Sequence, residues 1–263
     1  MLTIRSAGML ALAACVSDET RASADTARLR RADTVPVTAS RGGRSQEIYI
    51  DSVSGGNPLA VHGRARTFEN TVQVRARDER GDVIAEVFTT SVGEIGKHNP
   101  FTASVWLTRP PGARVIVESF EYSAQDGSVR SLTADTIAFE TPNASITVDF
   151  SSSDCAKTIS VRRNVPRSVA VARLLAEILV AGPDSAERAA GAASVFPRGS
   201  QVQSVILRHG ELTVDFNERL QNVGGACAAQ AIRTSVTSTL SRLPSVRRVI
   251  ITAAGSRDLA LQP

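Results

Sequence analysis

Six short runs of β-branched and other apolar residues follow one another between Ile48 and Phe139. Their short length favours strands over helices in this part of the chain. Turn residues such as Gly81 separate the runs, and the stretch TVQVRARD at 71–78 alternates cleanly between apolar and polar side chains. Such alternation is typical of a strand that buries one face. Half a dozen strands in roughly 95 residues predict an all-β sandwich of the immunoglobulin type.

From Ile146 onward the pattern changes to mixed strands and helices. Strand-like runs lie at 145–150 and 158–163, and a helical repeat follows, with Pro166 in its first turn and Gly182-Pro183 at its end;. Two further β runs surround His209-Gly210, which is typical of a hairpin. A second helix over 227–243 and a last strand over 246–252 complete the order β-α-β-β-α-β. This order predicts a compact α+β domain.

The chain therefore divides into four predicted parts. We expect a signal peptide over 1–14, a disordered tether over 15–45, the all-β domain over 46–142 and the α+β domain over 143–263. The tether assignment depends on composition, because residues 16–45 are polar, rich in Ala, Ser, Thr and Arg, and have no apolar periodicity. Such a segment buries too little apolar surface to offset the entropy of ordering.

Cys15 stands at the end of a short export-like segment. Arg5 precedes the apolar run SAGMLALAA at 6–14, as in a signal peptide;. The order Leu12-Ala13-Ala14-Cys15 resembles the bacterial lipobox, which implies acylation of Cys15 and an extracytoplasmic protein anchored to the membrane. The run is too short to span a bilayer, which needs about 20 apolar residues. The alternatives are an ordinary signal peptide, or an apolar start with a chance cysteine.

The other two cysteines, Cys155 and Cys227, both fall in the predicted α+β domain. If Cys15 is acylated, they form an even number in an oxidising compartment, which favours a disulfide. Cys155 lies just before a predicted strand and Cys227 at the start of the second predicted helix, so the pairing is sterically plausible. The alternative is two buried free thiols.

Residue patterns typical of catalysis or metal binding are missing from the sequence. The histidines have no partner at metal-ligand spacing, and neither Cys-x-x-Cys, Gly-x-Ser-x-Gly nor a phosphate-binding glycine loop occurs;. We therefore expect no enzyme, no metal and no cofactor, and we assign His209 and Asp215 to turn or capping roles. The net charge is only +4 and basic residues occur in runs no longer than two, which argues against a nucleic-acid partner;.

Residues 48–139 resemble the immunoglobulin-like domain of bacterial spore germination proteins. The resemblance lies in PLAVHGRARTFENTVQVRARDERGDVIAE, NPFTASV and FEYSAQDGS. It marks Phe68, Glu69, Asp126 and Gly127 as family-motif residues.

Residues 146–263 resemble the GerMN domain of sporulation and germination proteins. The strongest marks are Leu-x-x-Gly-Pro, which ends in Gly182 and Pro183, and the strand end with Asp215 and Phe216. Together the two resemblances imply a non-enzymatic, lipid-anchored envelope protein that acts as an interaction or assembly module. Its partners would be envelope proteins or the cell wall. The alternative function is a lipoprotein that binds peptidoglycan or another cell-wall glycan.

Overall fold

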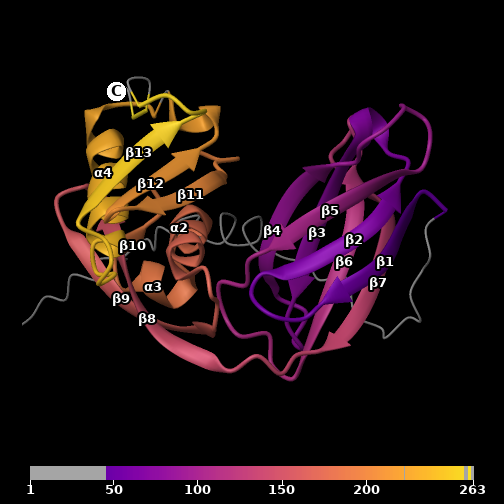
Figure 1. Ribbon diagram of the computed structural model, residues 1–263, viewed down its shortest axis with the longest axis horizontal. Coiled ribbons are helices and arrows are strands. Elements are labelled where there is room, and N and C mark those ends of the chain that lie inside the picture. The colour runs from indigo at the N-terminus through magenta and orange to yellow at the C-terminus, as the bar shows by residue number, and fades with distance from the viewer. Residues whose placement is uncertain (1–45, 222, 258–259, 262–263) are drawn as a thin grey trace, which may run out of the picture. The chain divides into compact units, whose positions relative to one another are not determined.

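The computed structural model describes residues 46–221, 223–257 and 260–261 (Figure 1). The predicted signal peptide, the acylation of Cys15 and the tether lie outside these residues. Two separate hydrophobic cores form, one from residues between Ile48 and Phe139 and the other from residues between Val148 and Leu261. This agrees with one all-β unit followed by one α+β unit, while the domain boundaries stay predictions.

The first unit is a sandwich of two antiparallel sheets (Figure 1). One sheet has the strand order β1 (Ile48–Ser54), β2 (Leu59–Ala65) and β5 (Asn99–Val105). The other has the order β4 (Val83–Thr90), β3 (Thr71–Arg77), β6 (Arg114–Tyr122) and β7 (Val129–Ala138). Seven strands in two sheets confirm the predicted immunoglobulin-type sandwich.

The alternation in β3 fixes which face of its sheet is buried. Val72, Val74 and Ala76 are fully buried, and they pack in one core with Val61 of β2 and Phe101 of β5. The inner faces of the two sheets therefore supply the core, as the period-2 pattern predicts.

Gly63 lies at a close approach inside the sandwich. A Cβ atom there would lie 2.2 Å from the backbone oxygen of Tyr49 and 2.5 Å from the ring of Phe101. The first neighbour is backbone in the paired strand β1, so it cannot rotate away. Only glycine fits at this position in β2.

We predict that Gly63→Ala lowers the free energy of unfolding by about 1–3 kcal/mol, because the added methyl overpacks the core. Gly55→Ala is the matched control, since a Cβ at Gly55 meets nothing within 4 Å. The control should change stability by less than about 0.5 kcal/mol. Urea unfolding checks both variants, and equal stability of the two would contradict this packing.

The described residues of the second unit form three α-helices and two three-stranded sheets. The sheets have the orders β10-β8-β9 and β11-β12-β13, and β12 and β13 are parallel. Taken from β9, the larger elements follow the predicted order β-α-β-β-α-β, with β8 added in front and α3 and β10 in between. The elements are β8 (Asn143–Ser152), β9 (Thr158–Pro166), α2 (Val171–Ala181), α3 (Ser185–Ala189), β10 (Ala192–Ala193), β11 (Val202–Arg208), β12 (Glu211–Phe216), α4 (Ala226–Leu240) and β13 (Arg248–Ala253).

The start of α2 differs from the prediction. Pro166 is not in its first turn but is the last residue of β9, opposite Asn143, and the helix begins at Val171. The φ angle of proline suits the end of a strand as well as the first turn of a helix, so the sequence signal did not separate the two. The predicted end is confirmed, because Gly182 caps the helix with φ +78°.

The predicted hairpin at His209-Gly210 is also confirmed. β11 and β12 pair up to Arg208 and Glu211, and the two turn residues have φ angles of 52° and 84°. Two positive φ angles are characteristic of the type I′ turn, which suits the twist of a two-residue hairpin. The role of His209 in a turn follows from this geometry.

Helix α4 packs on the second core along one stripe. Ile232, Val236 and Leu240 recur at i, i+4 and i+8 and are fully buried. The helix also meets β8 through polar groups, since Thr239 Oγ1 accepts a hydrogen bond of 2.9 Å from the backbone N–H of Asp149. Asp149, only 1% exposed, accepts hydrogen bonds from the guanidinium of Arg242, just after the helix, and from Ser160 Oγ.

Candidate functional site

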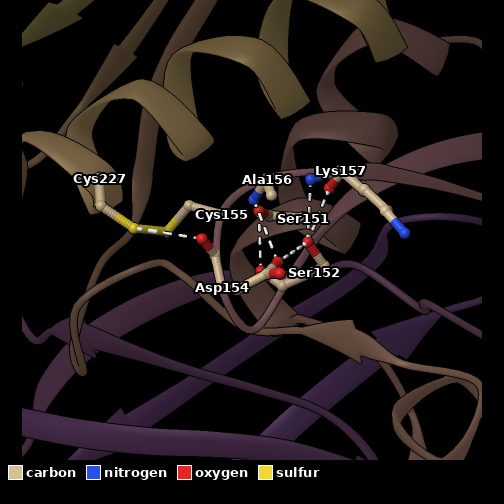
Figure 2. Close-up of a disulfide and its surroundings, with 7 residues drawn as sticks. All are labelled: Ser151, Ser152, Asp154, Cys155, Ala156, Lys157 and Cys227. Atoms are coloured by element: carbon tan, nitrogen blue, oxygen red, sulfur yellow. Dashed lines mark hydrogen bonds between the residues drawn. A yellow bond between two sulfur atoms is a disulfide. The ribbon is translucent and has the colours of Figure 1, made fainter.

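The two cysteines of the second unit are bonded to each other (Figure 2). Cys155 lies in the turn between β8 and β9, and Cys227 is the second residue of α4. Their Cα atoms are 5.8 Å apart, within the range that a disulfide requires;. The predicted pairing is confirmed, and the alternative of two free thiols is wrong.

A hydrogen-bonded turn presents Cys155 to the helix (Figure 2). The carboxylate of Asp154 accepts hydrogen bonds from Ser152 Oγ and from the backbone N–H of Ala156, and Ser152 Oγ accepts one from the backbone N–H of Lys157. The Ser152 hydroxyl, followed by the Ala156 amide, lowers the pKa of Asp154 below its usual range. The carboxylate therefore stays ionised and holds the turn, in which Cys155 has a positive φ of 57°.

The disulfide and Asp149 hold opposite ends of α4. The disulfide joins the first turn of α4 to the residues that follow β8, and Asp149 of β8 joins Thr239 and Arg242 at the far end. The helix is thus attached to the β8–β9 hairpin at both termini. The two cysteines are 72 positions apart in the sequence, so the disulfide closes a long loop of the chain.

We predict that reduction of the disulfide lowers the stability of the second unit by roughly 4 kcal/mol, because it frees a loop of 72 residues in the unfolded chain;. Calorimetry with and without a reductant measures this change. The transition of the first unit should not move, because no cysteine occurs between residues 46 and 154. A second-unit transition that stays in place on full reduction would contradict the prediction.

The motif residues of the second unit end two different elements. Gly182-Pro183 terminates α2, and the oxygen of Gly182 accepts a hydrogen bond of 2.8 Å from Arg163. Asp215 lies near the end of β12, where its carboxylate accepts hydrogen bonds from Thr252 Oγ1 at 2.6 Å and the backbone N–H of Gly255 at 2.9 Å. Phe216 is fully buried. Gly182 thus ends a helix and Phe216 belongs to the core, and the hydrogen bonds of Asp215 fit its predicted turn or capping role.

Asp126 and Gly127 form the turn between β6 and β7. The Asp126 carboxylate accepts hydrogen bonds from Ser128 Oγ at 2.8 Å and from the Ser128 backbone N–H at 3.1 Å, and Gly127 has φ +71°. The hydroxyl of Ser128, assisted by that of Ser123, lowers the pKa of Asp126 to about 2. This motif therefore specifies a tight, ionised turn.

Phe68 and Glu69 belong to a second structured loop of the sandwich. They open the short 3-10 turn Phe68–Asn70, in which Glu69 and Asn70 both have positive φ angles, 53° and 57°. Such backbone is costly for residues other than glycine and persists only where the surroundings fix it. Here the hydrogen bonds of the Asn70 side chain fix this backbone conformation.

Asn70 joins two loops into one rigid end. Its buried side chain donates to the backbone oxygen of Gly93 at 3.2 Å and accepts from Asn99 Nδ2 at 3.3 Å. Its backbone oxygen accepts from the N–H of Ser91 at 2.8 Å. We call residues 66–70 and 91–98 together the loop end of the sandwich.

The loop end carries apolar side chains that point to solvent. Phe68 is 68% exposed, Val92 77% and Ile95 80%, although the residues beneath them, Asn70 and Asn99, are buried. The family motif had singled out Phe68, but sequence reasoning missed Val92 and Ile95. The signal that could have found them is an isolated valine and an isolated isoleucine among the polar residues of SVGEIGKHN, outside any strand pattern.

The chain enters the sandwich at this same end. The backbone oxygen of Gln46 lies 2.9 Å from Nε2 of His98, and the guanidinium of Arg66 pairs with Glu47 at 2.6 Å. Both contacts join the first described residues to the loop end. The described chain therefore begins in contact with both loops of the loop end, through Arg66 and His98.

The described residues contain no metal-binding group of side chains and no membrane-spanning helix. Among residues 46–221, 223–257 and 260–261, no group of three or more His, Cys, Asp or Glu side chains is arranged to hold a metal ion. Within the same residues, every helix is too short or too polar to cross a bilayer.

Each of the two units matches a known protein family. Residues 49–128 match the family described as the immunoglobulin-like domain of bacterial spore germination, and residues 147–258 match the family described as sporulation and spore germination. The chain carries two germination-type domains. The resemblances found in the sequence are thereby confirmed, and neither family is a known enzyme family.

Two solved structures align with less than half of the chain. The tandem GerMN domains of the sporulation protein GerM from Bacillus subtilis align with a TM-score of 0.38 and 17% identity, over 46% of this chain and 42% of that one. The first GerMN domain of the same protein aligns with a TM-score of 0.36 and 22% identity, over 43% of this chain and 85% of that one. The chain thus spans less than half of the tandem structure. No curated protein matches the chain.

Proposed function

We propose that this protein is a lipid-anchored, extracytoplasmic interaction module of a bacterial envelope, without catalytic activity of its own. In this proposal Cys15 carries the lipid, residues 15–45 connect the anchor to the folded domains, and the two germination-type domains bind envelope proteins. The descriptions of their families support a role of the sporulation and germination type.

The disulfide is the observation that carries this proposal. Disulfides form and persist in exported proteins and are rare in the bacterial cytosol. Cys155 and Cys227 are placed for bonding by a turn and a helix far apart in sequence. The pairing therefore supports export independently of the lipobox-like residues before Cys15.

The proposed anchor predicts the behaviour of one variant. In the producing bacterium, Cys15→Ser should move the protein from the membrane fraction to the soluble extracytoplasmic fraction, because acyl chains provide the stable attachment. Fractionation followed by mass spectrometry of the N-terminal peptide measures this. Val169→Ser is the control, since it replaces a fully exposed side chain, keeps all three cysteines and should leave the protein in the membrane fraction.

An unmodified, uncleaved N-terminus in the wild-type protein would refute the anchor. Crosslinking in intact cells, followed by identification of the co-purified proteins, tests the interaction role. Envelope proteins crosslinked to either domain would support the proposal. Retention on purified peptidoglycan without any protein partner would instead favour a glycan-binding lipoprotein.

A further inference from the structure

We propose that the loop end inserts Phe68, Val92 and Ile95 into the surface of the phospholipid bilayer that holds the anchor. This inference rests on the proposed function for the anchor at Cys15, and it adds a second, non-covalent membrane contact made by the folded protein itself. The occupant of the loop end would be lipid, not another protein. The following observations favour this choice.

The loop end presents its apolar groups on a rigid support. Asn70 holds the two loops through Gly93 and Asn99, and Ser91, which is 1% exposed, donates to the backbone oxygen of Asn70. The apolar side chains are therefore not the ends of loose loops that could fold inward. Large apolar side chains held in water by a rigid frame mark a contact surface.

The small area of the exposed apolar side chains suits lipid better than a folded partner. With 68–80% of each side chain exposed, the three residues offer roughly 400 Å², taking about 150–200 Å² for a whole large side chain;. A stable protein interface needs about 800 Å² on each partner. Shallow insertion into the headgroup region needs only a few apolar side chains that project, and it reaches about 5–10 Å deep.

The Lys and Arg side chains of the loop end equal its carboxylates in number, with Arg66 and Lys97 against Glu69 and Glu94. Lys97 pairs with Glu94 at 2.6 Å, and Arg66 pairs with Glu47 at 2.6 Å. The loop end therefore lacks a surplus of one sign with which to attract an oppositely charged partner. The contact should depend on apolar insertion and be indifferent to the charge of the lipid headgroup.

The described chain begins at the loop end, and this bears on how far an anchor at Cys15 can be from it. Residue 46 lies at the loop end, against His98, and Cys15 is 31 positions earlier in the sequence. A chain of that length reaches roughly 30 Å if it behaves as a flexible coil. A bilayer that holds Cys15 is thus within easy reach of Phe68, Val92 and Ile95.

Tryptophan fluorescence on vesicles tests the contact. The full chain with Ile95→Trp is coupled through Cys15 to a maleimide phospholipid in phosphatidylcholine vesicles, with or without brominated acyl chains. The coupling selects Cys15, because Cys155 and Cys227 are bonded to each other. It also replaces the cellular acylation, so the result does not depend on whether bacteria modify Cys15.

Val169→Trp is the matched control. Val169 is the most exposed large apolar residue of the described chain, at 105%, and it lies in the second unit, before α2. Both variants keep Trp106, the only natural tryptophan, as a common background. A thermal melt of each variant confirms that the fold is intact.

We expect brominated lipid to reduce the added Ile95→Trp emission by about twofold, because the side chain lies within the shallow headgroup layer. Val169→Trp should lose no emission. In the Ile95→Trp background, Phe68→Ser with Val92→Ser should abolish most of the quenching. Raising the salt from about 0.1 M to about 1 M, where the Debye length falls from about 10 Å to 3 Å, should leave it unchanged.

Three results would overturn the inference. Equal quenching of Ile95→Trp and Val169→Trp would mean that the loop end has no special contact with lipid. An Ile95→Trp emission that shifts to the blue without bromine quenching would mean that protein covers the loop end, either a second copy or residues 16–45. Loss of quenching at high salt would mean that charge, not apolar insertion, holds the contact.

Discussion

The second unit depends on the attachment of α4 to the β8–β9 hairpin at both ends. At one end the disulfide between Cys155 and Cys227 restricts the chain, and at the other the buried carboxylate of Asp149 is satisfied by Arg242 and Ser160. A buried charge is tolerated only where it is paired and hydrogen-bonded, so Asp149 also fixes where the helix must end. Between these two points the apolar stripe of α4 completes the core. The disulfide, the hydrogen bonds of Asp149 and the apolar stripe therefore all hold α4 in the same position.

The sandwich uses the same principle at its loop end without a covalent bond. Asn70 has an unfavourable backbone conformation, and its hydrogen bonds to Gly93, Ser91 and Asn99 offset that cost;. The result is a rigid pair of loops beside the point where the chain enters the domain. Because the polar groups point inward and are paired, apolar side chains are left on the outside. A structural network of this kind can thus create a contact surface.

Sequence reasoning was most successful where the pattern is local or repeated. The alternation in β3, the hairpin at His209-Gly210 and the helix end at Gly182 follow from side-chain period and turn chemistry, and the structure confirms each. The predicted helix start was wrong because Pro166 suits two local conformations, and its pairing with Asn143, 23 positions earlier in the chain, places it in the strand. From the sequence only Phe68 of the loop end was singled out. The exposure of Val92 and Ile95 arises from contacts of Asn70 with residues 21 to 29 positions away. No local pattern encodes such contacts.

The proposed export requires that the bond between Cys155 and Cys227 forms in the cell. The most direct measurement is thiol trapping in the producing cells: acid quenching, alkylation of the denatured protein, and peptide mass spectrometry with and without prior reduction. We expect that neither Cys155 nor Cys227 is alkylated until the sample is reduced, and that both are alkylated after reduction. Alkylation of both cysteines in the unreduced sample would contradict it.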